Sequence, residues 1–336
     1  MRCRAAIVGL GQIGSQCDDQ GPDGEIWTHA GAYRALSEID LVSGADPDEG
    51  RLRRFVERRG VTIGYRSYRE MLANECIQIL SVCAPTPLHH EVVLEAARAG
   101  VCAIFCEKPL ASTMDEAVEM VEACDSAGVV LAVNHTRRWD PIYQRARDLI
   151  ANGTIGRLET IAGFYPGKVF TLGTHLFDLM RFFAGDVEWV CGDAVGYHEG
   201  EWSFSGLLRF DSGVRGTVLC GQSTRNHVFE VDLIGSDGRM RLIDDGNRIE
   251  LARFDGSARY AGHRELTQLL SLTRSDVRGD NRLTAAVRDI VNCARLGGTP
   301  AGSGRDGMAA LAIAWALCES TALGSVRVDV RRTVSR

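Results

Sequence analysis

The glycines near the start of the chain constrain its fold more than any other feature. Residues 9–14 have the sequence Gly-Leu-Gly-Gln-Ile-Gly and directly follow a short apolar run at residues 5–8. A G-x-G-x-x-G pattern between an apolar strand and a helix is typical of a βαβ unit whose chain turns sharply at the carboxyl end of its first strand. We therefore expect a parallel, helix-covered sheet to begin here.

Each glycine of this turn has its own task if the unit binds a dinucleotide. Gly9 permits the tight turn, Gly11 lets a pyrophosphate approach the main chain, and Gly14 allows the helix to pack closely on the strand. Gln12 and Ile13 lie between them, where the free N–H groups of the helix start can bind the phosphates. The alternative is an ordinary glycine turn, which the preceding strand disfavours.

The first third of the chain alternates strands and helices. Its strands are apolar at consecutive positions, which indicates a sheet covered on both faces. The expected strands are residues 5–8, 39–45, 77–83, 101–105 and 129–133, and the expected helices are residues 48–59, 88–99 and 114–127. Asp, Gly and Pro interrupt the first helix over residues 18–24, either as a break or as an inserted loop.

Beyond residue 137 the pattern changes to longer alternating runs. These runs, at residues 202–210, 214–220 and 228–234, are separated by Asp-Ser-Gly and Ser-Asp-Gly turns, which indicates antiparallel hairpins. We expect an α/β domain over residues 1–136 and an α+β domain with a largely antiparallel open sheet over residues 137–336. The helices expected in the second domain are residues 141–151, 174–184 and 281–296, and a helix at about 305–323 is expected to pack back on the first domain.

Composition narrows the class of protein. Hydrophobic residues make up 45% and charged residues 24% of the 336 residues, close to the globular average. Nucleic-acid binding needs clustered positive charge, whereas the net charge of this chain is −6, so we do not expect nucleic acid as a partner. No apolar run approaches the ~18 residues of a membrane-spanning helix, so we do not expect a membrane as a partner either. The 11 cysteines form no Cys-x-x-Cys pair and no zinc-like cluster, which indicates a cytoplasmic protein with reduced thiols and no metal.

A carboxylate follows the second expected strand. Residues 45–47 are Ala-Asp-Pro, which places Asp46 where a dinucleotide-binding fold contacts the adenosine ribose. A carboxylate there binds the ribose hydroxyls and repels a 2′-phosphate, so it favours NAD over NADP. Arg51, Arg53 and Arg54 follow closely and keep NADP possible, although a solvated helix face is their ordinary role.

Several further segments carry a family resemblance when they are taken in order. They are Ala84-Pro85-Thr86-Pro87-Leu88-His89-His90, Cys106-Glu107-Lys108-Pro109-Leu110, Arg137-Arg138-Trp139-Asp140-Pro141 and Gly173-Thr174-His175-Leu176-Phe177-Asp178. Together with the glycine turn and Asp46-Pro47, this set resembles the glucose–fructose oxidoreductase, inositol dehydrogenase and rhizopine-catabolism (Gfo/Idh/MocA) family over nearly the whole chain. The resemblance implies an N-terminal Rossmann domain and hydride transfer between a nicotinamide and a secondary alcohol.

The chemistry of hydride transfer needs an acid/base beside the reacting hydroxyl. Lys108 at the carboxyl end of a strand would face the crevice where ligands bind, whereas an isolated lysine before a proline would be an ordinary surface residue. The resemblance implies that Lys108 is this acid/base and that His175 approaches the substrate hydroxyl, although a buried structural histidine is the alternative for His175. Residues implied to contact the cofactor are Ala84, Pro85, Thr86, His89, Glu107 and Lys108.

The substrate side departs from the family pattern at one position. Many members have an aspartate four residues before the histidine, and this chain has Thr171 there. The departure argues against a Lys-Asp-His relay and against a free cyclic polyol as the substrate. The other substrate-binding candidates are Arg137, Arg138, Lys168 and Thr174, together with Lys108 and His175.

These inferences predict an NAD(P)-dependent oxidoreductase acting on a sugar, cyclitol or sugar derivative. The resemblance also implies a homodimer or homotetramer. Two alternatives stay open: an NAD-dependent glycoside hydrolase that oxidises its substrate transiently, and a dinucleotide-binding regulator without turnover.

Overall fold

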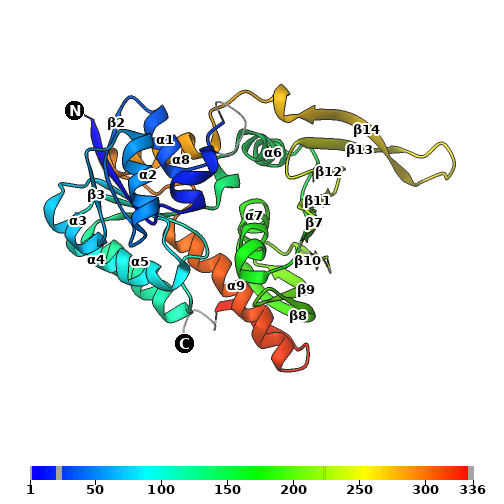
Figure 1. Ribbon diagram of the computed structural model, residues 1–336. Coiled ribbons are helices and arrows are strands. Elements are labelled where there is room, and N and C mark those ends of the chain that lie inside the picture. Colours follow the sequence, from blue (N-terminus) through cyan, green and yellow to red (C-terminus); the bar gives the residue numbers. More distant parts are fainter. Residues whose placement is uncertain (1, 20–24, 222, 224, 332–336) are drawn as a thin grey trace. The chain divides into compact units, whose positions relative to one another are not determined.

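The computed structural model describes residues 2–19, 25–221, 223 and 225–331. The chain forms two compact units, and each unit consists of two separate stretches of the sequence (Figure 1). The first unit comprises residues 1–139 and 280–308, and the second comprises residues 140–279 and 309–336. The predicted insertion at residues 18–24 lies mostly outside the described residues, since only its first two residues are described.

The first unit contains the predicted parallel sheet. Its six strands have the order β3-β2-β1-β4-β5-β6, and every neighbouring pair is parallel. This order is that of a dinucleotide-binding Rossmann domain, and it brings the carboxyl ends of β1 and β4 side by side where the strand order reverses. The strands are β1 (Cys3–Val8), β2 (Ile39–Ala45), β3 (Ile63–Tyr65), β4 (Ile79–Val82), β5 (Ala103–Cys106) and β6 (Val130–Val133).

Helices cover both faces of this sheet, as its apolar strands require. Cys3, Ala5 and Ile7 of β1 pack into a core with α1 and α8, whereas the alternate residues Ala6 and Val8 are buried on the other face. The helices of the unit are α1 (His29–Ala35), α2 (Glu49–Arg59), α3 (Tyr68–Asn74), α4 (His89–Arg98), α5 (Met114–Ala127), α8 (Arg282–Leu296) and the first residues of α9 (Gly304–Ala322).

The position of α8 differs from the sequence-based expectation. The sequence pattern places this helix in the second domain, but in the structure it belongs to the first unit. Leu283, Val287 and Ile290 form its apolar face, and they are buried in the same core as Phe105 of β5 and Tyr33 of α1. The amphipathic pattern predicted the helix but carried no information about which sheet it covers.

The second unit is a mixed, mostly antiparallel sheet of nine strands. Their order is β14-β13-β12-β11-β7-β10-β9-β8-β15, and β7–β10 is the parallel pair. The strands are β7 (Leu158–Tyr165), β8 (Val187–His198), β9 (Glu201–Phe210), β10 (Arg215–Cys220), β11 (Glu230–Gly235), β12 (Gly238–Ile243), β13 (Arg248–Gly256), β14 (Arg264–Thr273) and β15 (Val328–Asp329). The alternating pattern of the sequence thus corresponds to strands with one buried face.

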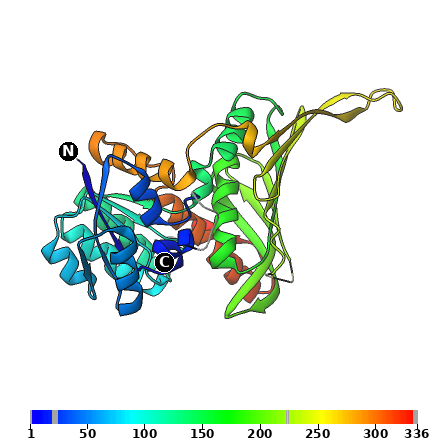
Figure 2. The same ribbon diagram turned by 45° about the horizontal axis from the view of Figure 1, so that its top comes forward.

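Helices lie against one face of this sheet, as Figure 2 shows for α6 (Pro141–Ala151) and α7 (Thr174–Ala184). A side chain on Gly163 of β7 would collide with Leu176 of α7, so this glycine allows the close packing. On the other face Leu207 is half exposed. The sequence therefore predicted an open sheet correctly.

Candidate functional site

The glycine turn has the geometry that a pyrophosphate needs. Gly9 ends β1 with a φ of 89°, and a Cβ there would lie 2.5 Å from the main chain of Ala84. A Cβ on Gly14 would lie 2.1 Å from the carbonyl oxygen of Gly9, so neither position accepts a side chain. In contrast, a Cβ on Gly11 would meet nothing within 4 Å, which leaves open space above the turn. Gln12 and Ile13 follow in a short π-helical turn, Gln12–Gln16.

A cavity of about 620 Å³ opens beside this turn. It lies at the carboxyl ends of β1, β2 and β4, the edge where Rossmann domains bind dinucleotides. Its lining includes Gly9, Gly11, Ala84, Pro85 and Asp46 from the predicted cofactor residues, and Arg51, Arg66, Tyr68 and Leu88 besides. The position and the open space above Gly11 fit the pyrophosphate and adenosine portion of a dinucleotide.

Asp46 lines this cavity and also holds the main chain around it in place through hydrogen bonds. It is buried, and its two carboxylate oxygens accept hydrogen bonds from the main-chain N–H of Leu10 at 2.8 Å and of Asp48 at 2.9 Å. The Arg51 guanidinium lies 3.7 Å away. Asp46 therefore links the second strand to the glycine turn and places a carboxyl group in the wall of the cavity.

Glu107 and Lys108 follow β5 at the same edge of the sheet. Glu107 is buried, and its Oε1 accepts hydrogen bonds from His29 Nε2 at 3.0 Å and from Asn134 Nδ2 at 2.5 Å. Burial alone would raise the pKa of Glu107, but the bond to His29, the charges of His29 and Lys108 and the bond to Asn134 lower it to about 2. An ionised carboxylate thus adjoins Lys108.

The hydrogen bonds of His29 extend this network into the core. Because ionised Glu107 only accepts, His29 Nε2 donates the hydrogen bond that joins the two side chains. The Ser81 hydroxyl lies 2.7 Å from His29 Nδ1 and 2.7 Å from the Tyr33 hydroxyl, so a chain of hydrogen bonds connects Tyr33 through Ser81 and His29 to Glu107.

His29 and Asn134 were missed by the sequence reasoning. His29 begins α1 and lies 78 positions before Glu107, and nothing in its local sequence distinguishes it from an ordinary helix residue. Asn134 directly follows β6, the strand next to β5, so its position at the carboxyl end of a strand was the only available signal.

His89 lies beside the Lys108–Pro109 segment and is not among the residues that line the cavity. The side chain is buried, with Nε2 2.9 Å from the Ala84 carbonyl oxygen and Nδ1 3.0 Å from that of Pro109. Burial lowers the pKa of His89. Its ring therefore ties the loop after β4 to the Lys108–Pro109 segment. Thr86, the remaining predicted residue of this loop, begins a short 3₁₀ turn, Thr86–Leu88.

Arg137 and Arg138 are both buried in the first unit. Arg138 donates a hydrogen bond to the Ala301 carbonyl at 2.9 Å and pairs with Asp306 at 3.0 Å. These contacts engage its guanidinium with the start of α9. They give Arg138 a structural task within its own unit.

The predicted substrate residues of the second unit lie on the turn before α7 and on α7 itself. Lys168 adopts a left-handed conformation with a φ of 59°, and its ammonium pairs with Glu199. Thr174 is buried and its hydroxyl donates to the Phe170 carbonyl at 2.7 Å. His175, the second residue of α7, is half-buried.

Glu201 is a third residue that the sequence reasoning missed. It begins β9, and it accepts hydrogen bonds from the Thr171 hydroxyl at 2.6 Å, from the Thr171 N–H at 2.9 Å and from the Phe170 N–H. A carboxylate therefore lies beside Thr171, where the sequence itself has none. The pairing joins residues 30 positions apart, so no local pattern indicated it.

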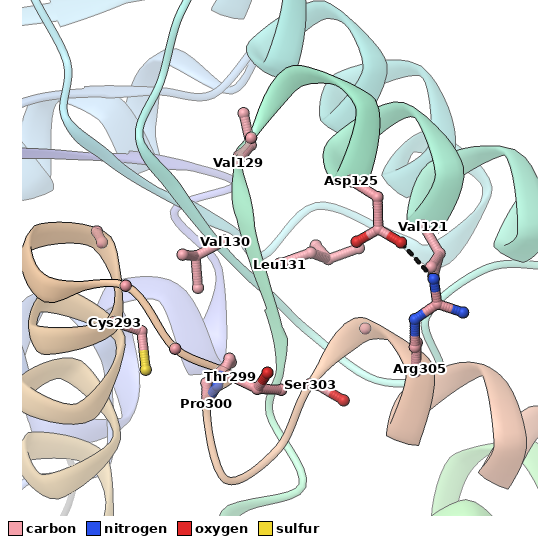
Figure 3. A pocket seen from close by; sticks show the side chains of 15 residues that line it. Val121, Asp125, Val129, Val130, Leu131, Cys293, Thr299, Pro300, Ser303 and Arg305 are labelled. Atoms are coloured by element: carbon pink, nitrogen blue, oxygen red, sulfur yellow. Dashed lines mark hydrogen bonds and ion pairs between the residues drawn. The ribbon is translucent and has the colours of Figure 1, made fainter.

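A second cavity, of about 410 Å³, lies elsewhere in the first unit (Figure 3). Val129 and Val130 in its wall are at the amino end of β6, opposite the edge that carries the glycine turn. Arg305 in this wall pairs with Asp125 at 2.5 Å, and Ser303 bonds to Asp306 at 2.7 Å. Arg305 and Ser303 thus already have partners within the protein, and we assign the functional site to the cavity beside the glycines.

The described residues contain neither a cluster of metal-ligating side chains nor a membrane-spanning helix. No group of three or more metal-ligating side chains occurs among residues 2–19, 25–221, 223 and 225–331. Within the same ranges, each helix is too short or too polar to cross a bilayer.

Comparisons with known proteins agree with this geometry. Residues 3–135 match the model of an oxidoreductase family with an NAD-binding Rossmann fold, and residues 165–241 match the C-terminal domain of the same GFO/IDH/MocA family. D-Apiose dehydrogenase of Paraburkholderia graminis is 30% identical over 85% of this chain and 82% of its own length. Myo-inositol 2-dehydrogenase of Thermotoga maritima is 27% identical over 94% of this chain and 96% of its own length.

A solved structure shows the same fold. Levoglucosan dehydrogenase in complex with NADH and levoglucosan superposes with a TM-score of 0.83 at 20% identity, covering 98% of this chain and all of the other. The glycine turn, the carboxylate at its side and the matching relatives together identify the chain: it belongs to the Gfo/Idh/MocA family of NAD-binding oxidoreductases and is an NAD(P)-dependent dehydrogenase or reductase acting on CH–OH groups.

Proposed function

We propose that the protein oxidises a secondary hydroxyl of a sugar, cyclitol or sugar derivative, or reduces the corresponding ketone, with Lys108 as the acid/base. The observation that carries this proposal is the position of Lys108. It directly follows β5 and buried, ionised Glu107, at the sheet edge that also carries the glycine turn. The names of the relatives support the substrate class, since they are dehydrogenases of apiose and inositol.

The nicotinamide, when bound, accepts or supplies the hydride. In the oxidation direction Lys108 Nζ takes the proton of the substrate hydroxyl, and in the reduction direction it returns a proton to the carbonyl oxygen. Glu107 is a negative charge next to Lys108 in the sequence, and hydrogen bonds from His29 and Asn134 hold its carboxylate in place. Because Glu107 is already ionised and hydrogen-bonded, its task is to orient the segment and not to exchange the proton.

His175 is the second proposed catalytic residue, as a hydrogen-bond partner of the reacting oxygen. The turn before it is fixed by two carboxylates, because Glu199 pairs with Lys168 and Glu201 binds Thr171. In this proposal Lys168, Thr171 and Thr174 shape the substrate wall around His175. A wall of hydroxyl, carboxylate and imidazole groups suits a hydroxyl-rich substrate, since each can exchange hydrogen bonds with an alcohol.

The decisive experiment is a panel of sugars, cyclitols, uronates and nucleotide sugars, each incubated with NAD and with NADP while reduced cofactor is measured. We expect steady NADH formation with at least one member of the panel. Cleavage of a glycoside without net NADH would instead establish the hydrolase alternative. Tight NAD binding without turnover on any member of the panel would favour the regulator and overturn the proposal.

The proposal includes assembly into a homodimer or homotetramer in the cytoplasm. All 11 cysteines are free thiols, consistent with a reducing compartment. Half-exposed apolar residues on the open face of the second sheet, such as Leu207 and Leu219, support association of copies.

A further inference from the structure

The task proposed for Lys108 conflicts with the charge of its neighbour. A free lysine side chain has a pKa of about 10.4, so a lysine that exchanges protons near neutral pH needs surroundings that favour its neutral form. The buried carboxylate of Glu107 does the opposite, because a nearby negative charge favours the ammonium form. Glu107 is also joined to this segment, since its Oε2 accepts a hydrogen bond from the Lys108 N–H at 3.3 Å. A positive charge close to Glu107 would remove the conflict.

The His29 ring lies where such a positive charge is needed. Its side chain is fully buried, and Nε2 lies 3.0 Å from Oε1 of Glu107. An ionised carboxylate at this distance favours the protonated form of a histidine, and the attraction is stronger in a buried setting than in water. The pair of His29 and Glu107 then has no net charge.

Two hydroxyl groups on the other side of the ring suit the protonated form. Ser81 Oγ lies 2.7 Å from His29 Nδ1, and the Tyr33 hydroxyl lies 2.7 Å from Ser81 Oγ. A hydroxyl both donates and accepts, so Ser81 can accept the Nδ1–H of His29 and donate its own proton to the Tyr33 oxygen. Both N–H groups of a protonated ring thus have an acceptor within the core.

Other titratable groups close to this pair are buried, and burial favours their neutral forms. They are Tyr33, Cys83 and Cys106, whose pKa values burial raises, and His89, whose pKa burial lowers. The balance of charge beside Lys108 in this network therefore depends on Glu107 and His29.

We propose that His29 is a positioning residue for proton transfer, because its protonated ring is the counter-charge of Glu107 and lets Lys108 lose and regain a proton. This inference rests on the proposed role of Lys108 as the acid/base. His29 acts through Glu107 and has no contact with the reacting atoms in this proposal, since its ring is fully buried. Without the charge of His29, Glu107 would act on Lys108 as an uncompensated anion.

The composition of the chain makes the proton affinity of Lys108 directly measurable. Lysine occurs at two positions in the sequence, Lys108 and Lys168. Protein labelled with ¹³C and ¹⁵N in its lysine side chains therefore gives two sets of NMR signals, and Lys168→Arg identifies them. The pH dependence of the Lys108 signal gives the midpoint of its titration without substrate or turnover.

The test removes the charge of His29 and keeps its hydrogen bond. In His29→Gln the amide N–H still donates to Glu107, so we expect the titration midpoint of Lys108 to rise by about one pH unit or more, the usual effect of a nearby uncompensated charge. The pH of half-maximal oxidation rate should rise with it. In the double variant His29→Gln/Glu107→Gln both charges are absent, so the midpoint should return to the wild-type value or below.

His90→Gln is the matched control. His90 Nε2 lies 2.7 Å from Glu119 Oε2, so this pair has the same chemistry, but it lies at the surface, where water screens its charges. The control should leave the titration of Lys108 unchanged. Unaltered NADH binding and melting temperature establish that each variant is folded.

The charge of His29 is measured in the wild-type protein with ¹⁵N-labelled histidine. A protonated ring has hydrogen on both nitrogens at neutral pH, whereas a neutral ring has it on one. His29→Gln identifies the signals, and if that variant does not fold, variants of the other buried histidines, His89 and His135, identify them by elimination.

Two outcomes overturn the inference: a neutral His29 in the wild-type protein at neutral pH, or an unchanged titration of Lys108 in folded His29→Gln. A Lys108→Met protein with wild-type turnover would instead refute the proposed function. The two failures are distinguishable, because both NMR measurements proceed without turnover.

Discussion

The strongest stability prediction concerns the carboxylate of Glu107. Its pKa is about 2, against an ordinary value of 4.5. The hydrogen bonds from His29 and Asn134 and the charges of His29 and Lys108 lower the pKa by more than burial raises it. A decrease of this size corresponds to about 3 kcal/mol of folding free energy at about 1.4 kcal/mol per pKa unit. Glu107→Gln removes the charge and keeps the shape, so we expect it to lower the free energy of unfolding by about this amount at pH 7.

The pH dependence has a definite sign. A lowered pKa in the folded state means that the contribution of Glu107 is complete above pH 4.5 and is lost as the pH falls towards 2. The difference between wild type and Glu107→Gln should therefore be constant from pH 6 to 8 and about half as large near pH 3.

Chemical denaturation at a series of pH values measures this difference, provided that the transitions of the first unit are resolved. Glu119→Gln is the matched control, because Glu119 pairs with His90 at the surface and an exposed pair contributes little. A Glu107→Gln protein as stable as wild type at pH 7, or a difference independent of pH, would refute the electrostatic reasoning.

The remaining predictions concern the reaction. Lys108→Met should abolish turnover while leaving NAD affinity nearly unchanged in a direct titration; wild-type rates would remove the catalytic assignment. NAD should bind more tightly than NADP, and Asp46→Ser should narrow the preference, because Asp46 places a negative charge at the ribose position; tighter NADP binding by wild type would contradict this. His175→Ala should lower kcat by ~10²–10⁴-fold, the usual effect of losing a positioned acid/base. Thr171→Ala should have a mild effect at saturating cofactor, since two main-chain N–H groups still bind Glu201; equal losses in the two variants would refute the role of His175.

Much of the fold could be predicted because its signals are local. The glycine turn and the consecutive apolar runs predicted the parallel sheet, and the bounds expected for two helices, residues 141–151 and 174–184, match α6 and α7. The strands β12 to β14 are among those that were not predicted. β14 is exposed along nearly its whole length and has no alternating pattern, whereas β12 and β13 alternate buried and partly exposed residues, a signal that the sequence reasoning did not use. The membership of α8 also depends on tertiary packing, which the period of a helix does not specify.

The site residues also divide into those with a local sequence signal and those without one. Lys108 and Glu107 could be located because they follow a strand within one short motif. Their partner His29 comes from a helix that begins after an interrupted segment, and Glu201 reaches Thr171 from another strand. Such pairs depend on the register of distant elements, so a single sequence contains no pattern that reports them.

The hydrogen bond between His29 and Glu107 makes the His29 ring a natural spectroscopic probe. Its ring is fully buried, and the Nε2–H faces an ionised carboxylate at 3.0 Å. A ring proton in this setting exchanges slowly with water and resonates well downfield of the amide envelope, so NMR can observe it as an isolated signal. Because Glu107 adjoins Lys108, that signal reports the charge state beside the proposed acid/base without any label in the active site.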